Sequence, residues 1–537
     1  MALTAPAAEA RPIPRDAALS LRRRIGVSWP LFAALGAAIV CAAPALTVLI
    51  VGLGAPAPPA DASTLLWSSI AGTATLVICA GAAATVLGAA AAWLVTLCQF
   101  PGRALFEWLL VAPLAAPGYV LAYAYGAITG PGGPAPIHLS GAWGAGVVYA
   151  LGFYPYIYLS ARAAFVSQSV CALEAARALG ARPWEVFWRV AAPLAWPGIA
   201  AGAALACMEI AAEYGAASYF GATTVTTGVF KAWFARGEPQ LAMQLASFLL
   251  LGALALLFVE RLARGRRNFA GASARWRPLP RYQLAPAPAS AATLFCAGLT
   301  FLGALLPMGW LVRLASFRPL ADWAELAAPL GRTLLLASAG AAVTLALSAL
   351  VAASARHKAG RIGAFAASIG YAAPGAVTAL GALALFGMAR DAGLVGGLGG
   401  ALSLAALLWV YASRFAAAGA QPIEAGLTRV TQHMSDAGRT LGAAPARRLR
   451  LIELPIAAPG VFAGALVVFV DILKELPATL VLRPFNFETL AVRANAYASD
   501  DRLAQAAAPA LLITLAGLAP VILLSRRLSR ARAGDRS

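Results

Sequence analysis

Five charged residues stand inside long apolar stretches, where a charge is costly and is therefore usually functional. They are Glu209, Glu213, Asp471, Lys474 and Glu475. Each stretch carries two carboxylates four residues apart, a spacing that predicts one shared helix face. Carboxylate oxygens are hard ligands that suit a hard cation. The two acidic pairs could therefore line a cation path, or they could form a structural network that Lys474, the one basic residue predicted inside a span, and nearby arginines neutralise. The sequence leaves both interpretations open.

The two acidic pairs recur at a fixed distance along the chain, and so do the segments before them. Residues 436–464 repeat residues 174–202 at an offset of 262 without a gap, and the acidic pairs keep the same offset. The shared glycines and prolines cannot arise from a common richness in alanine. An internal repeat of this kind predicts two homologous halves that run in the same direction.

Each repeated segment has the composition of two short helices with a corner between them. Gly180 or Gly442 supplies a backbone that turns freely at the corner. Pro183 or Pro445 suits the first turn of the second helix. The second helices carry apolar side chains: Trp184, Phe187 and Trp188 in the first copy, and Leu449, Leu451 and Ile452 in the second. Such side chains indicate docking into another protein, although basic amphipathic helices also lie on bilayer surfaces.

The composition is that of a membrane protein. Of the 537 residues, 61% are hydrophobic and only 12% are charged, whereas soluble proteins carry about 25% charged residues. The formal net charge is +19, but the basic residues cluster in short runs between apolar stretches. This pattern is typical of cytoplasmic loops, and we expect no nucleic-acid partner.

Other chemistry finds little support in the sequence. The six cysteines form no CxxC pair and the three histidines are far apart, so neither a disulfide framework nor a metal cage is indicated, and the identity of any metal ligand stays unknown. The phosphate-binding pattern GxxxxGK[ST] does not occur, so any ATP hydrolysis must come from a partner. No set of nucleophile, base and metal ligand points to an enzyme.

We predict an all-α integral membrane protein with about twelve spanning helices, because about 20 apolar residues cross a bilayer. The predicted spans are 31–54, 70–97, 105–129, 142–165, 194–221, 241–260, 291–312, 333–354, 363–389, 394–418, 456–482 and 505–525. The apolar stretch near the N-terminus is longer than the 7–15 residues of a cleaved signal, so we expect it to be retained. Most of the 41 Lys and Arg residues then fall on one side, which predicts cytoplasmic termini.

These spans predict five regions along the chain. They are a cytoplasmic N-terminal tail (1–28, loose up to Leu21), a first membrane half (29–262), a basic cytoplasmic linker (263–288), a second membrane half (289–527) and a cytoplasmic C-terminal tail (528–537). The repeated cytoplasmic segments lie at 174–193 in the first half and at 436–455 in the second.

Residues 174–193 and 436–455 resemble the EAA loop of ABC importer permeases, whose pattern is E-A-A, three residues, G, and then I-x-L-P. The second copy departs by opening Asp-Ala-Gly, and the first by ending Ala-Ala-Pro. The resemblance implies that both segments dock into clefts of two copies of a cytoplasmic ATPase subunit. The residues that it implies for this coupling are Glu174, Ala175, Arg177, Gly180, Pro183, Trp184 and Phe187, with Asp436, Arg439, Gly442, Pro445 and Leu449.

Two further stretches, Glu213–Phe234 and Lys474–Asn495, are similar to fused ferric-ion permeases of the binding-protein-dependent type. The resemblance implies the type I importer fold with two six-helix halves in a bacterial inner membrane, and import of ferric iron from a periplasmic binding protein. ATP and magnesium would bind the partner ATPase, and this chain would bind no cofactor. Fused permeases for thiamine or a phosphonate share the architecture, and a gradient-driven secondary transporter is the alternative from another class.

The outer loops Thr223–Gln240 and Arg483–Arg502 also carry aromatic and basic side chains. We interpret them either as the receiving surface for a binding protein or as segments that seal an outer gate, since such residues also anchor at membrane interfaces. Those side chains are Lys231, Trp233, Arg236, Arg483, Phe485, Asn486 and Arg493.

Overall fold

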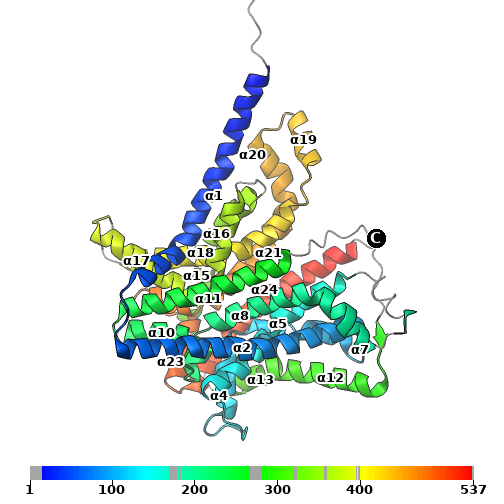
Figure 1. Ribbon diagram of the computed structural model, residues 1–537, viewed down its shortest axis with the longest axis vertical. Coiled ribbons are helices and arrows are strands. Elements are labelled where there is room, and N and C mark those ends of the chain that lie inside the picture. The colour runs from blue at the N-terminus through cyan, green and yellow to red at the C-terminus, as the bar shows by residue number, and fades with distance from the viewer. Residues whose placement is uncertain are drawn as a thin grey trace, which may run out of the picture.

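The computed structural model of the chain is built almost entirely of helices (Figure 1). It describes residues 15–168, 178–180, 183–265, 281–317, 323–355, 360–394, 396 and 399–534. The helices of the first part are α1 (Arg15–Gly54), α2 (Ala60–Leu97), α3 (Arg103–Leu109), α4 (Gly118–Thr129), α5 (Gly141–Val166), α7 (Pro183–Val186), α8 (Ala192–Ala212), α9 (Gly215–Tyr219), α10 (Val225–Phe230) and α11 (Pro239–Gly265).

The second part follows a similar order. Its helices are α12 (Pro286–Thr300), α13 (Leu306–Ser316), α15 (Ala327–Ala355), α16 (Arg361–Ala372), α17 (Gly375–Asp391), α18 (Gly400–Leu427), α19 (Gln432–Thr440), α20 (Pro445–Arg448), α21 (Leu454–Leu473), α22 (Pro477–Leu482), α23 (Leu490–Ser499) and α24 (Leu503–Gly534). Shorter helical segments are η1 (Ala112–Ala115), η2 (Phe187–Ala191), η3 (Lys231–Ala235), η4 (Phe301–Leu305) and η6 (Leu449–Glu453), and two strands are β1 (Cys98–Gln99) and β2 (Tyr282–Gln283).

The expected all-α membrane architecture is confirmed. Among the described residues, eight helices are long and apolar enough to cross a bilayer, and the number rises to ten if each of two bent helix pairs is one span. The predicted spans 142–165 and 505–525 correspond to α5 and to the apolar part of α24, Leu503–Leu518, which lie outside that count. The chain is therefore a multi-pass membrane protein.

Two predicted spans are not straight helices. The prediction of one helix over 105–129 is wrong, because the chain bends by 93° before α4, and that over 363–389 is wrong, because it bends by 110° before α17. A proline stands at each bend, Pro117 with ψ 152° and Pro374 with ψ 150°. Proline removes a helical hydrogen bond and pushes the residue before it out of the helical region, so each bend has a local cause.

Two other predicted spans also end early. The span expected over 194–221 stops at Ala212 and resumes as α9, and the span expected over 456–482 stops at Leu473 and resumes as α22. Glu213 follows the first stop with an extended backbone (ψ 126°). Broken helices inside a membrane protein leave backbone groups free, which is tolerated where they are buried in protein or line a cavity.

The internal repeat is visible in packing and in local geometry. Helix α5 packs against α2 and α8, and α18 packs against α15 and α21. A π-helical turn precedes α8 as η2 and precedes α21 as η6, at the same offset of 262. Glycines also allow close helix contacts in both copies, since a Cβ on Gly202 would lie 2.9 Å from Ile157 Cα and one on Gly464 would lie 2.7 Å from Gly419 O.

The first span of each part packs on the other part. Helix α1 lies against α16 and α17, while α13, the last section of the span that begins with α12, lies against α4. The strands β1 and β2 pair in parallel and join the end of α2 to the start of the second part. In Figure 1, α19 and α20 lie in the upper part of the view, below the N-terminal end of α1, and α7 lies on its right-hand side. The two parts are therefore interlocked.

The N-terminal and linker regions differ in part from expectation. Helix α1 begins at Arg15, whereas we expected a loose segment up to Leu21; the apolar part that could cross a membrane is Phe32–Gly54, close to the predicted span. Most of the predicted linker, residues 266–280, lies outside the described residues. The remaining linker residues include β2 and the start of α12.

Candidate functional site

The five charged residues predicted as a site come together around one cavity. The cavity has a volume of about 110 Å³, enough for several water molecules, since about 10–15 Å³ of such volume holds one. It lies where the broken helices α8–α9 and α21–α22 meet the bends before α4 and α17. Its charged lining consists of Glu209, Glu213, Arg414, Asp471, Lys474 and Glu475.

On the first-repeat side, the break after α8 places Glu213 beyond the helix end. Its carboxylate accepts a hydrogen bond from the backbone N–H of Ala216 (2.8 Å) and another from the hydroxyl of Tyr149 (2.9 Å). The prediction that Glu209 and Glu213 share one helix face is therefore wrong, because Glu209 stays in the last turn of α8. Both side chains still reach the same cavity.

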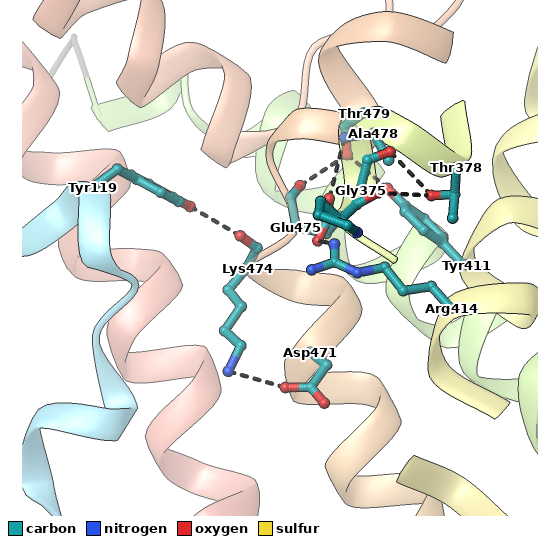
Figure 2. A network of polar contacts seen from close by, with 11 residues as sticks. Tyr119, Gly375, Thr378, Tyr411, Arg414, Asp471, Lys474, Glu475, Ala478 and Thr479 are labelled. Carbon is teal, nitrogen blue, oxygen red and sulfur yellow. Dashed lines mark hydrogen bonds and ion pairs between the residues drawn. The ribbon is translucent and has the colours of Figure 1, made fainter. Parts of the chain in front are cut away.

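On the second-repeat side, Glu475 takes the equivalent place beyond α21. One carboxylate oxygen accepts from the N–H of Ala478 (3.1 Å), and the other is ion-paired with Arg414 of α18 (Figure 2). The side chain of Glu475 is only 6% exposed. A buried charge of this kind is tolerated when it is paired and hydrogen-bonded.

A second ion pair lies one turn away. Lys474 Nζ is 2.9 Å from Asp471 Oδ1, and the hydroxyl of Tyr119 lies 3.5 Å from the backbone oxygen of Lys474 (Figure 2). Tyr119 belongs to α4, so this contact brings the bend before α4 to the break after α21. The predicted neutralising network therefore exists, at least for the carboxylates of the second repeat.

Arg414 is the functional residue that the sequence reasoning missed. We expected Lys474 alone to carry a positive charge within a span, and that expectation is wrong. Arg414 falls within the predicted span 394–418, near its C-terminal end, but was not counted there as a charge inside a span; α18 continues to Leu427, so Arg414 lies in its middle. The apolar residues on both sides of it were the available signal.

The cavity does not resemble a fixed metal cage. Within the described residues, no three His, Cys, Asp or Glu side chains lie close enough to hold a metal ion. No hydrogen bond or ion pair joins Glu209 to another described residue. Among the described residues, the carboxylates thus line the cavity without forming a metal cage.

The two predicted corners have the expected backbone. Gly180 has a φ of +80° and Gly442 a φ of +75°, a region that favours glycine. The leucine before each glycine is almost fully exposed: Leu179 at 88% and Leu441 at 86%. The two corners therefore present a matching apolar side chain.

The remaining predicted corner residues divide into three groups. Glu174, Ala175 and Arg177 lie outside the described residues. Pro183 and Pro445 begin α7 and α20, as expected, with Trp184 next to the first. In the third group, Asp436 and Arg439 form an exposed ion pair (2.9 Å), and Leu449 is 48% exposed. Phe187 is the exception, because its ring packs on that of Trp93 with the centroids 4.5 Å apart.

The predicted outer loops form two separate features. Phe485 is fully exposed at a tight turn where Asn486 has a φ of +59°, and Arg332 donates to the Asn486 carbonyl (3.1 Å). Arg236 is hydrogen-bonded to Glu238 (3.0 Å) and ion-paired with Asp61 of α2. These contacts raise the pKa of Arg236.

The other outer residues are mostly engaged within the chain. Arg493 pairs with Glu488 (2.8 Å), and Arg483 lies 3.4 Å from the carbonyl of Phe487. Lys231 and Trp233 belong to η3. Phe485 is therefore the aromatic side chain of these loops that is most available to a partner.

Comparisons with known proteins agree on one family. Residues 84–268 match the family described as binding-protein-dependent transport system inner membrane component. The chain is 24% identical over 466 residues to the Fe(3+)-transport system permease protein FbpB 2 of Haemophilus influenzae, covering 85% of this chain and 89% of that protein. It is 32% identical over 196 residues to the molybdenum transport system permease protein ModB of Escherichia coli, covering 34% of this chain and 86% of that protein.

A third relative matches a shorter stretch. The sulfate transport system permease protein CysW of Synechocystis is 30% identical over 141 residues, which cover 25% of this chain and 51% of that protein. The relatives thus differ in the substrates that their names give and agree in being permease subunits.

Proposed function

Because the chain belongs to the family of binding-protein-dependent transport system inner membrane components, we propose that it is the permease subunit of an ATP-driven importer that carries ferric iron into the cytoplasm. Like its relatives, the chain is a membrane channel component and not an enzyme. The relative named for ferric iron matches along most of both chains.

The charge of the cavity is the observation that favours a cation as the substrate. Four carboxylate side chains and two cationic ones line it, so a cation is attracted and an oxyanion such as molybdate or sulfate is repelled. The same argument disfavours a phosphonate. Thiamine is cationic and stays the alternative substrate for the same architecture.

The proposed architecture has twelve spans in two six-helix halves, 29–262 and 289–527, with both termini in the cytoplasm. Matching helix breaks, matching π-helical turns and matching three-helix packing support it. The resemblance to the EAA loop and the exposed Leu179 and Leu441 support two docking sites, one for each copy of a cytoplasmic ATPase that binds ATP and magnesium.

The route from these corners to the cavity is direct. The apolar helix Phe187–Ala212 leads from the first corner to Glu209, and Leu449–Leu473 leads from the second to Asp471. At 1.5 Å per residue, the 22 or so residues between a corner helix and its carboxylate span roughly 33 Å. Closure of the ATPases would move both helices as rigid levers and open the cavity outward, and hydrolysis would reverse the motion.

On the outer side, we propose that a periplasmic binding protein delivers ferric iron to the loops that carry Phe485 and Arg236. The exposure of Phe485 supports this role, because large exposed aromatic side chains mark interaction sites. The test is uptake of labelled ferric iron and labelled thiamine by vesicles that contain the complex with its binding protein. Iron uptake that needs ATP and is blocked by vanadate supports the proposal, and uptake driven by an ion gradient without ATP supports a secondary transporter.

A further inference from the structure

The two repeats pack their helices at equivalent backbone positions. A Cβ placed on Gly202 of α8 would lie against Ile157 of α5, and a Cβ placed on Gly464 of α21 would lie against Gly419 of α18. Each of these four residues maps on its counterpart at the offset of 262 that also relates the corners. Equivalent positions of α5 and α18 can therefore be assigned from packing as well as from sequence.

At this offset, the carboxylates are duplicated but the cations are not. Gly152 stands where α18 carries Arg414, and Ala212 stands where Lys474 follows α21, and all four positions line the cavity. Tyr149 and Tyr411 are also equivalent, yet Tyr149 donates to Glu213 whereas Tyr411 is bonded to Thr479 (2.7 Å). Both positive charges of the cavity thus come from the second repeat.

The consequence is an uneven distribution of charge. Arg414 pairs with Glu475, and Lys474 pairs with Asp471. On the opposite side, Glu213 receives only neutral hydrogen-bond donors. A paired carboxylate attracts a passing cation far less than one without a cationic partner.

We propose that Arg414 and Lys474 make the cation path one-sided, so that ferric iron passes along Glu209 and Glu213 while Asp471 and Glu475 hold the second repeat in place. The inference rests on the proposed function, because it names the wall of the cavity that the cargo follows. Arg414 and Lys474 act through the carboxylates that they neutralise and do not touch the cargo.

The first experiment compares the two walls in the complete complex, reconstituted with its ATPase and with a binding protein loaded with labelled ferric iron. Glu209→Gln is compared with the neutral pair Asp471→Asn/Lys474→Gln, which removes two opposite charges at once. We expect Glu209→Gln to lower the uptake rate at least ten-fold more than the neutral pair does. Equal losses, or a larger loss in the neutral pair, would overturn the inference.

The second experiment moves the lysine from one wall to the other. Ala212→Lys places an ammonium three residues after Glu209, as Lys474 follows Asp471, with Ala212→Met as the neutral variant of similar length. We expect the Lys variant to lose at least ten-fold more uptake than the Met variant. The protein Ala212→Lys/Lys474→Ala carries the lysine on the first-repeat wall instead of the second. In this protein, adding Asp471→Asn should lower iron uptake more than adding Glu209→Gln, which is the reverse of the order in the unaltered protein.

A purely structural role for these charges would not reverse that order, and an unchanged order would overturn the inference. Assembly of each variant is measured separately, by copurification of the ATPase and by ATP hydrolysis. If an exchanged variant fails to assemble, the first experiment alone decides between the two walls. If the unaltered complex takes up no ferric iron, the proposed function fails; if it does and the two walls behave alike, only the one-sided path fails.

Discussion

The ring centroid of Trp93 lies 4.5 Å from that of Phe187. Trp93 stands near the end of α2, and Phe187 is the first residue of the π-helical turn that leads into α8. The same indole lies 5.9 Å from the ring of Phe165 and 5.9 Å from the ring of Tyr282. One side chain therefore joins α2, α5, the first corner helix and the start of the second part.

Trp93→Ala should loosen this junction. Loss of a partly buried tryptophan should destabilise the protein by about 3 kcal/mol, and it should lower iron uptake more than ATP hydrolysis, because the corner helix loses its support. Thermal unfolding in detergent and uptake in vesicles measure the two effects. Trp67→Ala in the same helix is the control, since Trp67 is 62% exposed and should cost less than about 1 kcal/mol. Equal effects of the two substitutions would contradict the role of Trp93.

When both corner glycines are replaced, the loss of uptake should depend on how easily the new residue adopts a positive φ and not on the size of its side chain. No described atom lies within 4 Å of a Cβ placed on Gly180 or Gly442, so space is available at both. Valine at a positive φ costs about 1–2 kcal/mol per residue, whereas asparagine adopts this region more readily. We expect the double Val variant to lose most ATP-driven uptake and the double Asn variant to keep more of it. Uptake that is the same in both variants would argue against coupling through the corners.

Tyr149→Phe removes one of the two hydrogen bonds that hold the carboxylate of Glu213. A hydrogen bond to a charged group contributes about 1.5–3 kcal/mol, so the uptake rate should fall roughly ten-fold if the orientation of Glu213 matters. Tyr154→Phe is the matched control on the same helix, because the buried hydroxyl of Tyr154 has no partner among the described residues. That substitution should leave uptake unchanged and should not lower the unfolding temperature. A loss from Tyr154→Phe as large as that from Tyr149→Phe would contradict the prediction.

Arg414→Gln should be the most destabilising single change around the cavity. It leaves Glu475, which is 6% exposed, without its cation, and breaking a buried ion pair costs about 3–5 kcal/mol. The double substitution Arg414→Gln/Glu475→Gln removes both charges and should recover most of the lost stability. Unfolding temperatures of the purified variants test this. A double variant that is no more stable than the single one would show that Arg414 acts through other contacts.

The sequence predicted the charged residues of the cavity except Arg414, because each interrupts an apolar stretch. It also predicted the corners, because glycine and proline recur at one offset. It did not reveal how the helices break. The carboxylates of Glu213 and Glu475 accept the N–H groups of Ala216 and Ala478, and this local capping becomes evident only when both helices are seen to stop.

The pairing of Arg414 was also beyond the sequence. Its partner Glu475 is 61 residues away, and nothing in the local pattern joins the two. The inward position of Phe187 has a similar cause, because Trp93 of another helix decides which face of the corner helix is buried. Contacts between distant segments thus set what local patterns left open.

In the proposed importer, two cytoplasmic corners couple a separate ATPase to the charged cavity of this chain. This coupling is tested by measuring ferric iron uptake into vesicles that contain the complex. The loaded binding protein is supplied on the side of the membrane that carries Phe485, and ATP is supplied on the opposite side. We predict that uptake requires ATP, the ATPase and the binding protein together. We also predict that the Gly180→Val/Gly442→Val protein loses this uptake. Uptake that continues without ATP, or that the double valine protein retains in full, would contradict the account.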